Sequence, residues 1–379
     1  MKRHLKIVSV LLSAAVCLAV FVTDVECYTV NASGFVLINA DTFEVLTGDN
    51  IHKKLSMAST TKIMTALILA EQNTPEKEVI TTEEMVTVEG SSMGLLPGDS
   101  VSYYELMVGM MLPSGNDAAN TAAIAVAGSI EKFADLMNKK ALEIGMNNTH
   151  FVTPSGLDDD KHYSTAYDMA LLAAYALKND VLRDIMSKPS ITVTYGNPPY
   201  QRTLSNHNKL LKTYEYCIGV KTGFTKKSGR CLVSAAEKDG CRVIAVTLNA
   251  PNDWNDHEYL LEYGLGCLQQ QDVTYDLPIN NISVVGGDLD SVAVSTERFM
   301  CGCTDISKNG ISAKYEILPF IYAPVKIGQT VGKINYYYDN KIINSCDIIT
   351  INLTNRKEIK LTFKQKFKLN FNNIFNHYI

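Results

Sequence analysis

The sequence predicts an α/β (α+β) protein: an antiparallel sheet flanked by a helical cluster, then a small all-β domain and a C-terminal amphipathic helix. Three observations support this order. Short β-rich runs occur near residue 40 and again between residues 217 and 249, while the segment between them has helical periodicity. After about residue 272 the composition shifts to Val, Ile, Thr and Asn with frequent turns. Strands at both ends of a helical middle lead us to expect that the first and last strands meet in one sheet.

Length and composition point to an ordinary globular protein with more than one domain. The chain has 379 residues, of which 46% are hydrophobic and 20% charged. This length exceeds what a single core comfortably organises. The formal net charge of −5 gives no reason to expect nucleic acid as a partner.

The N-terminus has the pattern of an export signal covering residues 1–27. Lys2, Arg3 and Lys6 precede an apolar run from residue 7 to residue 22, and Cys27 offers a small residue before the cleavage point. An uncleaved anchor is the alternative, although 16 apolar residues are short for a membrane span. Either reading predicts that the remainder of the protein is exported.

The elements of the first domain, residues 28–272, follow from periodicity and turn residues. Strands are expected at 34–39 and 44–47, and a helix from Ser59 to about Gln72. Further helices are expected at 103–112, ended by Pro113, and at 118–127, 130–144 and 167–178, the last capped by Ser164 or Thr165. Strands at 217–222, 229–236 and 242–249 and a helix at 256–268 complete the domain.

An all-β domain is expected at 273–353, followed by a basic tail at 354–379. Residues 356–379 carry six Lys or Arg against one Glu, a net charge of +5, and their aromatic residues recur at helical spacing. A basic amphipathic helix of this kind binds a membrane surface. The alternatives are a helix packed on its own protein and a strand.

Seven cysteines follow the signal, an odd number with irregular spacing, so no disulfide pairing can be deduced. Cys301 and Cys303 form a C-x-C pair with no second pair or His pair nearby, so we do not expect a zinc site.

Ser59 and Lys62 are the first residues that suggest chemistry. They are three apart at the start of a helix, so their side chains lie one turn apart on one face. A hydroxyl beside an amine is a nucleophile beside a potential base. Taken alone, the pattern is more typical of an N-cap serine and a solvated lysine.

Two later segments change this interpretation. Ser114-Gly115-Asn116 supplies a second hydroxyl and a carboxamide, and Lys221-Thr222-Gly223 supplies a cation and a hydroxyl on a strand. Separately they are typical of a capping turn and an exposed strand end. Together, S-x-x-K, S-x-N and K-T-G in this order are the signature of penicillin-binding proteins and class A β-lactamases.

The sequence resembles the D-alanyl-D-alanine carboxypeptidase family of low-molecular-mass penicillin-binding proteins, which implies a serine DD-peptidase/β-lactamase-like fold. Supporting segments lie at 89–92, 148–151, 162–166 and 323–329, so the likeness covers nearly the whole chain. Two departures are visible. Met57 stands where the family has Pro, and Phe224 follows K-T-G where some relatives have His.

The resemblance implies a role for each motif residue and requires no cofactor or metal. Ser59 would be the acyl-ester nucleophile, Lys62 its general base and Ser114 the proton relay. The substrate-binding residues would be Asn116, Lys221, Thr222, Gly223 and, through its backbone N–H, Phe224, which would complete the oxyanion hole with the Ser59 N–H. The pKa of an ordinary lysine, ~10.4, must fall by about 3 units for Lys62 to act near neutrality, and burial and Lys221 are the expected causes.

The implied partners are a peptidoglycan pentapeptide, β-lactam antibiotics as covalent inhibitors, and a membrane surface bound by the C-terminal helix. The expected location is the outer face of the bacterial cytoplasmic membrane or the cell wall. A DD-endopeptidase, a β-lactamase and a non-catalytic sensor are alternatives, although no E-x-x-L-N motif is present. His162 and Asp168 could in principle form a Ser-His-Asp triad with Ser59. Because Lys62 already supplies the base, we interpret His162 as structural.

Overall fold

The computed structural model of the chain describes residues 28–358. The predicted signal peptide and residues 359–379 of the predicted C-terminal helix lie outside the described residues. All elements below belong to one compact unit that begins at Ala32. Within residues 28–358 no helix has the length and apolar character that crossing a membrane requires.

A five-stranded antiparallel sheet organises the first domain and confirms that its first and last strands meet. Its order is β2-β1-β9-β8-β7, and β1 pairs with β9, with Gly34 opposite Leu248. The strands are β1 (Gly34–Asn39), β2 (Val45–Asp49), β7 (Cys217–Thr225), β8 (Gly229–Lys238) and β9 (Cys241–Leu248). The inner strands β1, β8 and β9 are almost wholly buried, which explains their nearly continuous apolar sequences.

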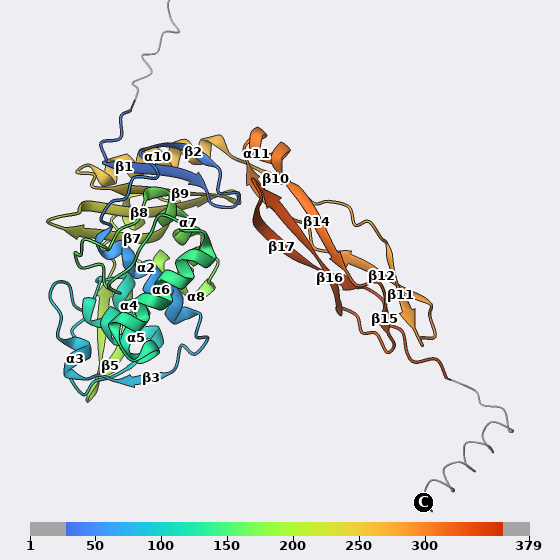
Figure 1. Ribbon diagram of the computed structural model, residues 1–379, viewed down its shortest axis with the longest axis horizontal. Coiled ribbons are helices and arrows are strands. Elements are labelled where there is room, and N and C mark those ends of the chain that lie inside the picture. The colour runs from blue at the N-terminus through green and yellow to red at the C-terminus, as the bar shows by residue number, and fades with distance from the viewer. Residues whose placement is uncertain (1–27, 359–379) are drawn as a thin grey trace, which may run out of the picture. The chain divides into compact units, whose positions relative to one another are not determined.

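Helices cover both faces of this sheet (Figure 1). On one face lie η1 (Ala58–Thr61), α2 (Lys62–Ala70), α4 (Tyr103–Met111), α5 (Asn116–Ala127), α6 (Ile130–Ile144), α7 (Ala166–Leu177) and α8 (Asp180–Ser187). On the other face lies α10 (Asp253–Cys267). Eight of the nine residues of α2 are buried, and α2 packs against α4, α5, α6, α7 and α8. The predicted helical cluster is therefore confirmed, with α2 at its centre.

Several helix boundaries differ from those expected. The helix predicted to start at Ser59 begins as the 3₁₀ turn η1, and its α-helical part starts at Lys62. Helix α5 begins at Asn116, two residues early, so Asn116 belongs to its first turn. Thr165 caps α7, as predicted, by accepting a hydrogen bond from the Asp168 N–H at 3.0 Å.

A second, four-stranded sheet has the order β3-β4-β5-β6 and was not predicted from the sequence. It consists of β3 (Glu78–Ile80), β4 (Ser100–Ser102), β5 (Ser190–Gly196) and β6 (Pro199–Ser205), and the short helices α3 (Glu83–Val86) and α9 (Leu210–Thr213) were also missed. Strands β5 and β6 form a hairpin whose turn contains Asn197 and Pro198.

The C-terminal domain is all-β, as expected, apart from the short helix α11 (Asp305–Gly310). Its six-stranded sheet has the order β14-β16-β17-β12-β11-β15. The strands are β11 (Asn281–Val285), β12 (Ser291–Thr296), β14 (Ser312–Ile317), β15 (Ile321–Tyr322), β16 (Thr330–Tyr338) and β17 (Lys341–Thr350). Alternate residues of β11 and β14 are exposed, as a sheet with one solvated face requires.

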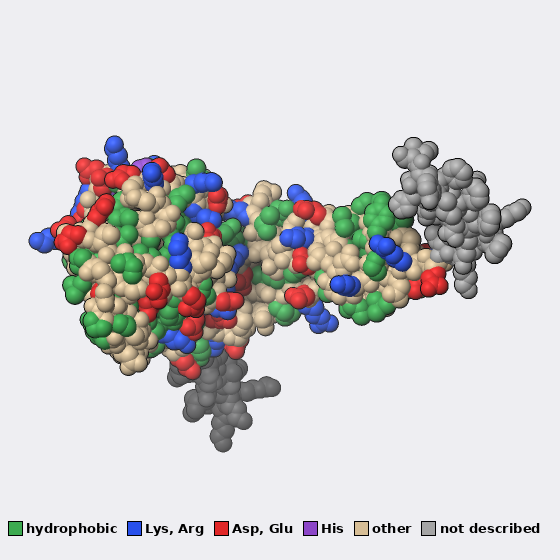
Figure 2. All heavy atoms as spheres, turned by 90° about the horizontal axis from the view of Figure 1, so that it is seen from below, with side chains coloured by type: hydrophobic (Ala, Val, Ile, Leu, Met, Phe, Trp, Pro, Cys, Tyr) green, Lys and Arg blue, Asp and Glu red, His purple; other side chains and the backbone are tan. Residues whose placement is uncertain are grey.

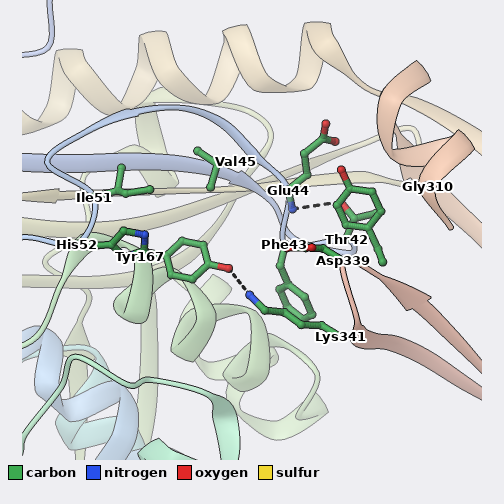
Figure 3. A pocket seen from close by; sticks show the side chains of 11 residues that line it. Thr42, Phe43, Glu44, Val45, Ile51, His52, Tyr167, Gly310, Asp339 and Lys341 are labelled. Carbon is green, nitrogen blue, oxygen red and sulfur yellow. Dashed lines mark hydrogen bonds between the residues drawn. The ribbon is translucent and has the colours of Figure 1, made fainter.

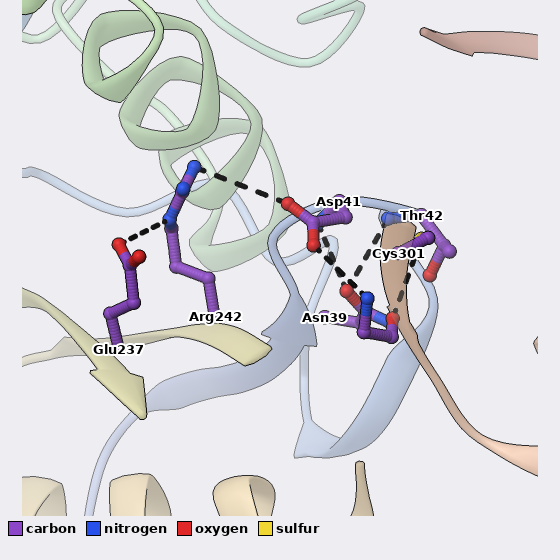
Figure 4. Close-up of polar contacts among 7 residues, drawn as sticks. Asn39, Asp41, Thr42, Glu237, Arg242 and Cys301 are labelled. Carbon is purple, nitrogen blue, oxygen red and sulfur yellow. Dashed lines mark hydrogen bonds and ion pairs between the residues drawn. The ribbon is translucent and has the colours of Figure 1, made fainter. Parts of the chain in front are cut away.

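A separate two-stranded ribbon of β10 (Gln269–Asp272) and β13 (Met300–Cys303) contacts the turn between β1 and β2 (Figure 4). Asn39 Nδ2 donates to the Gly302 carbonyl at 2.8 Å, and Arg242 lies between Glu237 and Asp41. Burial raises the pKa of Asp41. All seven described cysteines are free thiols.

Candidate active site

Three hollows in the described surface have volumes of about 280 Å³ or more. One of about 500 Å³ lies beside Cys241 and Gln270 and contains no predicted site residue. Another, of about 620 Å³, is lined by Phe43, Tyr167 and Lys341 among others and also contains none (Figure 3). Lys341 Nζ donates to the Tyr167 hydroxyl at 2.5 Å across it.

The third hollow, of about 280 Å³, brings five of the predicted residues together; we call it the active pocket. Its lining consists of Ser59, Ser91, Ser114, His207, Thr222, Gly223, Phe224, Arg230, Asp253 and Trp254. Lys62, Asn116 and Lys221, the other three predicted residues, are buried and are not part of the lining. The candidate site is therefore the smallest of the three hollows.

Ser59 and Lys62 meet as predicted, with Lys62 Nζ donating to Ser59 Oγ at 3.0 Å. Lys62 is fully buried and also donates to Asn116 Oδ1 at 2.6 Å and to the Ser155 carbonyl at 2.7 Å. All three partners are neutral oxygens, so none of these hydrogen bonds involves a carboxylate that would hold the ammonium charged.

The surroundings of Lys62 disfavour its charged form. Burial first, and then the charge of Lys221, lower the pKa of Lys62 well below its usual value, while Asp117 opposes the shift. Burial alone lowers the pKa of Lys221 to about 7.

The three hydrogen bonds that Lys62 donates describe its ammonium form; once neutral, the amine keeps its two N–H groups for Asn116 Oδ1 and the Ser155 carbonyl. Its lone pair can then accept the proton of the Ser59 hydroxyl 3.0 Å away.

Ser114 reaches the pocket through a strained backbone. It joins α4 to α5, is buried, and has a left-handed φ of 65°. A non-glycine residue in this region is uncommon and costs about 1–3 kcal/mol. Ala58, directly before Ser59, is also left-handed, with a φ of 48°. Such strain is concentrated at functional sites, and here it occurs at or beside two of the three predicted catalytic residues.

Strand β7 forms the opposite wall and approaches the nucleophile very closely. A Cβ added at Gly223 would lie only 3.0 Å from the Ser59 backbone nitrogen and 3.1 Å from the Met57 carbonyl oxygen. Any side chain at this position would force the backbone around Ser59 to shift. Since β7 is an edge strand, its outer side is available to an extended ligand. The Phe224 side chain is 66% exposed.

The pocket wall carries a cation that was not predicted from the sequence. Arg230, on β8, donates from Nε and Nη2 to Asp253 Oδ1 at 2.9 and 2.8 Å. Its guanidinium lies 5.5 Å from the centroid of the Trp254 ring. Asp253 is buried and begins α10, so the pair depends on a contact between residues 23 apart. In sequence, Arg230 has no signal except its position directly after the turn that follows β7.

His162 does not form a triad with Ser59. The buried ring accepts a hydrogen bond from the Val152 N–H at Nδ1, 2.9 Å away, so its Nε2–H donates to Thr61 Oγ1 at 2.8 Å. Burial lowers the pKa of His162 to about 4, and the ring is neutral at physiological pH. Asp168 instead accepts hydrogen bonds from Asn148 and Thr149. These contacts agree with a structural role for His162.

Metal-ligating side chains do not gather in the described part of the chain. Between residues 28 and 358, no three His, Cys, Asp or Glu side chains are grouped so that they could hold a metal ion.

The fold and the pocket define a class of enzyme: a serine acyl-transfer enzyme whose hydroxyl is paired with a buried lysine. The chain belongs to the D-alanyl-D-alanine carboxypeptidase family. The family model of that description matches residues 21–252, and the model of the C-terminal domain of penicillin-binding protein 5 matches residues 270–366.

Known relatives span most of the chain. It is 32% identical to D-alanyl-D-alanine carboxypeptidase DacF of Bacillus subtilis, covering 82% of this chain and 83% of the relative. It is 34% identical to D-alanyl-D-alanine carboxypeptidase DacC of Escherichia coli, covering 86% and 85%. The crystal structure of D-alanyl-D-alanine carboxypeptidase DacD from Francisella tularensis matches with a TM-score of 0.62 and 27% identity, over 87% of this chain and 95% of that one.

Proposed function

We propose that this member of the D-alanyl-D-alanine carboxypeptidase family uses Ser59 to remove the terminal D-alanine from peptidoglycan pentapeptide stems. The observation that carries the proposal is the 3.0 Å contact between Ser59 Oγ and a fully buried, carboxylate-free Lys62 Nζ. Neutral Lys62 takes the Ser59 proton as Oγ bonds to the carbonyl carbon of the penultimate D-Ala. The developing oxyanion is held by the N–H groups of Ser59 and Phe224.

The intermediate then collapses to an acyl-enzyme. The C–N bond to the terminal D-Ala breaks, and its amine receives the proton from Lys62 through the Ser114 hydroxyl, which lies on the pocket lining. Asn116 keeps Lys62 in place through the 2.6 Å hydrogen bond to Nζ. Water then hydrolyses the ester, and Lys62 serves again as the base that activates it.

The burial of Lys221 changes how we assign the substrate carboxylate. Lys221 was expected to bind it directly, but Lys221 is 1% exposed and donates to the Thr222 carbonyl at 3.0 Å. Arg230 and Thr222 do line the pocket. We therefore assign the carboxylate to the Arg230 guanidinium and the Thr222 hydroxyl. To Lys221 we assign a share, second to burial, in lowering the pKa of Lys62.

Release of D-alanine from a pentapeptide, with and without benzylpenicillin, tests the proposal. We expect release by the full chain, its inhibition by penicillin through a long-lived adduct, and no release by a folded Ser59→Ala variant. Release that persists in Ser59→Ala would refute the assigned nucleophile. Rapid penicillin hydrolysis would favour a β-lactamase, and release of cross-linked stems would favour a DD-endopeptidase.

We also propose that the protein acts outside the cytoplasmic membrane, bound to its surface by the C-terminal tail. Exposed apolar side chains gather at the end of the C-terminal domain where the described chain finishes (Figure 2). Exposed apolar residues on or next to β15 and close to the last described residues include Tyr322 at 67%, Phe320 at 42% and Leu353 at 55%. Aromatic residues of this kind favour a membrane interface.

Truncation after Glu358 should release the protein from vesicles containing anionic lipid without loss of D-alanine release. A truncated protein that remains bound would refute attachment through the tail.

A further inference from the structure

An irregular segment, residues 89–95, contributes one residue to the lining of the active pocket; we call this segment the rim loop. Ser91, in this loop, lines the pocket beside Ser59 and Ser114. The loop has no helix or strand, and Gly90 and Gly94 have left-handed φ angles of 93° and 86°. Its conformation must therefore be fixed by contacts with the rest of the domain.

The buried carboxylate of Asp117, in the first turn of α5, makes most of these contacts. It accepts hydrogen bonds from Ser92 Oγ at 2.6 Å, the Met93 N–H at 2.9 Å, and the Gly94 and Leu95 N–H groups at 3.0 Å each. Asp117 is 1% exposed. Four charge-assisted hydrogen bonds from four consecutive residues gather the loop around one side chain.

The rim loop also packs against the ends of α4 and α5 without spare volume. A Cβ at Gly109 would lie 2.2 Å from Met93 Sδ, and one at Gly115 would lie 2.9 Å from the Met93 nitrogen and 2.7 Å from Asp117 Oδ1. Both positions need glycine because the loop lies so close. A change in loop conformation is therefore transmitted directly to the junction that carries Ser114 and Asn116.

The loop in turn fixes the orientation of Asn116. Asn116 Nδ2 donates to the Glu89 carbonyl at 2.6 Å. The backbone N–H of Asn116 donates to the Ser91 carbonyl at 2.7 Å. Because Nδ2 is engaged in this way, Oδ1 is the atom that faces Lys62 Nζ at 2.6 Å.

We propose that Asp117 is a positioning residue, whose carboxylate folds the rim loop so that the Glu89 carbonyl orients the Asn116 amide toward Lys62. This inference rests on the proposed function, since it assigns a role in the acylation step. It is independent of the S-x-N motif, which includes Asn116 but not Asp117. Besides its contacts with Asn116, the loop keeps the hydrogen bonds from Tyr195 to the Met93 carbonyl and from Arg202 to the Gly94 carbonyl. Loss of the carboxylate should therefore loosen the loop without detaching it.

The substitution Asp117→Asn isolates the carboxylate because it preserves side-chain size. An amide offers one acceptor atom in place of two, and its NH₂ group would face backbone N–H donors. We expect the acylation rate constant of Ser59 with a fluorescent penicillin to fall at least about tenfold. The dissociation constant of the initial penicillin complex should change less than about threefold. Hydrogen exchange should show that the amides of residues 93–95 lose protection.

Asp168→Asn is the matched control. Asp168 is also buried in the first turn of a helix, α7, and also holds a preceding loop, through Asn148 and Thr149. Asp168→Asn should lower the unfolding temperature but leave the acylation rate within about twofold. An equal loss of acylation rate in both variants would show that Asp117 contributes only to the general stability of the fold, and would overturn the proposal.

A double-mutant cycle tests the route through Asn116. In an Asn116→Ala background, Asp117→Asn should lower the acylation rate less than about threefold further. A full loss of about tenfold in that background, or unchanged protection of residues 93–95, would overturn the proposal. Failure of the wild-type protein to react with penicillin would contradict the proposed function alone, and hydrogen exchange would still decide whether Asp117 holds the loop.

Discussion

Replacement of Arg230 by Gln should weaken the enzyme selectively toward substrates with a free C-terminal carboxylate. Lys62 and Lys221 are buried, so Arg230 is the cation that the pocket lining presents to a ligand. A hydrogen bond to a charged group contributes about 1.5–3 kcal/mol. The Arg230 side chain is 41% exposed, which screens the interaction toward the lower figure. We therefore expect kcat/KM to fall about tenfold.

The assay compares an acyl-D-Ala-D-Ala peptide with its C-terminal amide. Arg230→Gln should lower kcat/KM for the acid about tenfold and for the amide less than about twofold. Arg242→Gln is the matched control, because Arg242 is also ion-paired, with Glu237, but lies on β9 outside the pocket lining. Equal losses for the acid and the amide would refute carboxylate recognition by Arg230, and so would an unchanged kcat/KM for the acid.

The site makes three further predictions. The folded pKa of Lys221 is about 7 against ~10.4 unfolded, so the unfolded chain binds the extra proton between these values. The free energy of unfolding should therefore rise with pH from about 7 to about 10, and Lys221→Met should reduce that slope in urea titrations by up to about 1.4 kcal/mol per pH unit; equal slopes would contradict the shift. Gly223→Ala should slow penicillin acylation at least about tenfold, because the new Cβ displaces the Ser59 N–H, and an unchanged rate would count against this geometry. His162→Gln should leave D-alanine release within about threefold between about pH 5 and about pH 8, since the ring is neutral there; a loss of about a hundredfold would restore a catalytic role for His162.

Motifs and periodicity predicted the parts of the site that depend on local geometry. Ser59 and Lys62 are one turn apart, and their contact follows from that spacing alone. Helices were predicted at 103–112, ended by Pro113, and at 130–144, and the structure places them at Tyr103–Met111 and Ile130–Ile144. The meeting of β1 and β9 was inferred from element order.

Contacts between distant segments could not be predicted in this way. Arg230 depends on Asp253, the first residue of α10, and Asp117 depends on a loop more than 20 residues earlier. The buried state of Lys221 also depends on tertiary packing, which is why our proposal transfers carboxylate binding to Arg230. The β5–β6 hairpin, by contrast, could have been predicted from local pattern. Its apolar residues alternate with polar ones, and Val193, Tyr195 and Leu204 are buried as that alternation indicates.

The most direct test of the central claim is to locate the adduct that forms when the full chain reacts with benzylpenicillin. Rapid acid quenching followed by peptide mass mapping should find one penicilloyl group per chain, on Ser59, and none in the Ser59→Ala variant. The adduct should appear at the rate at which D-alanine release is lost. An adduct on Ser91 or Ser114, or loss of activity without any adduct, would contradict the assignment of Ser59 as the nucleophile activated by Lys62.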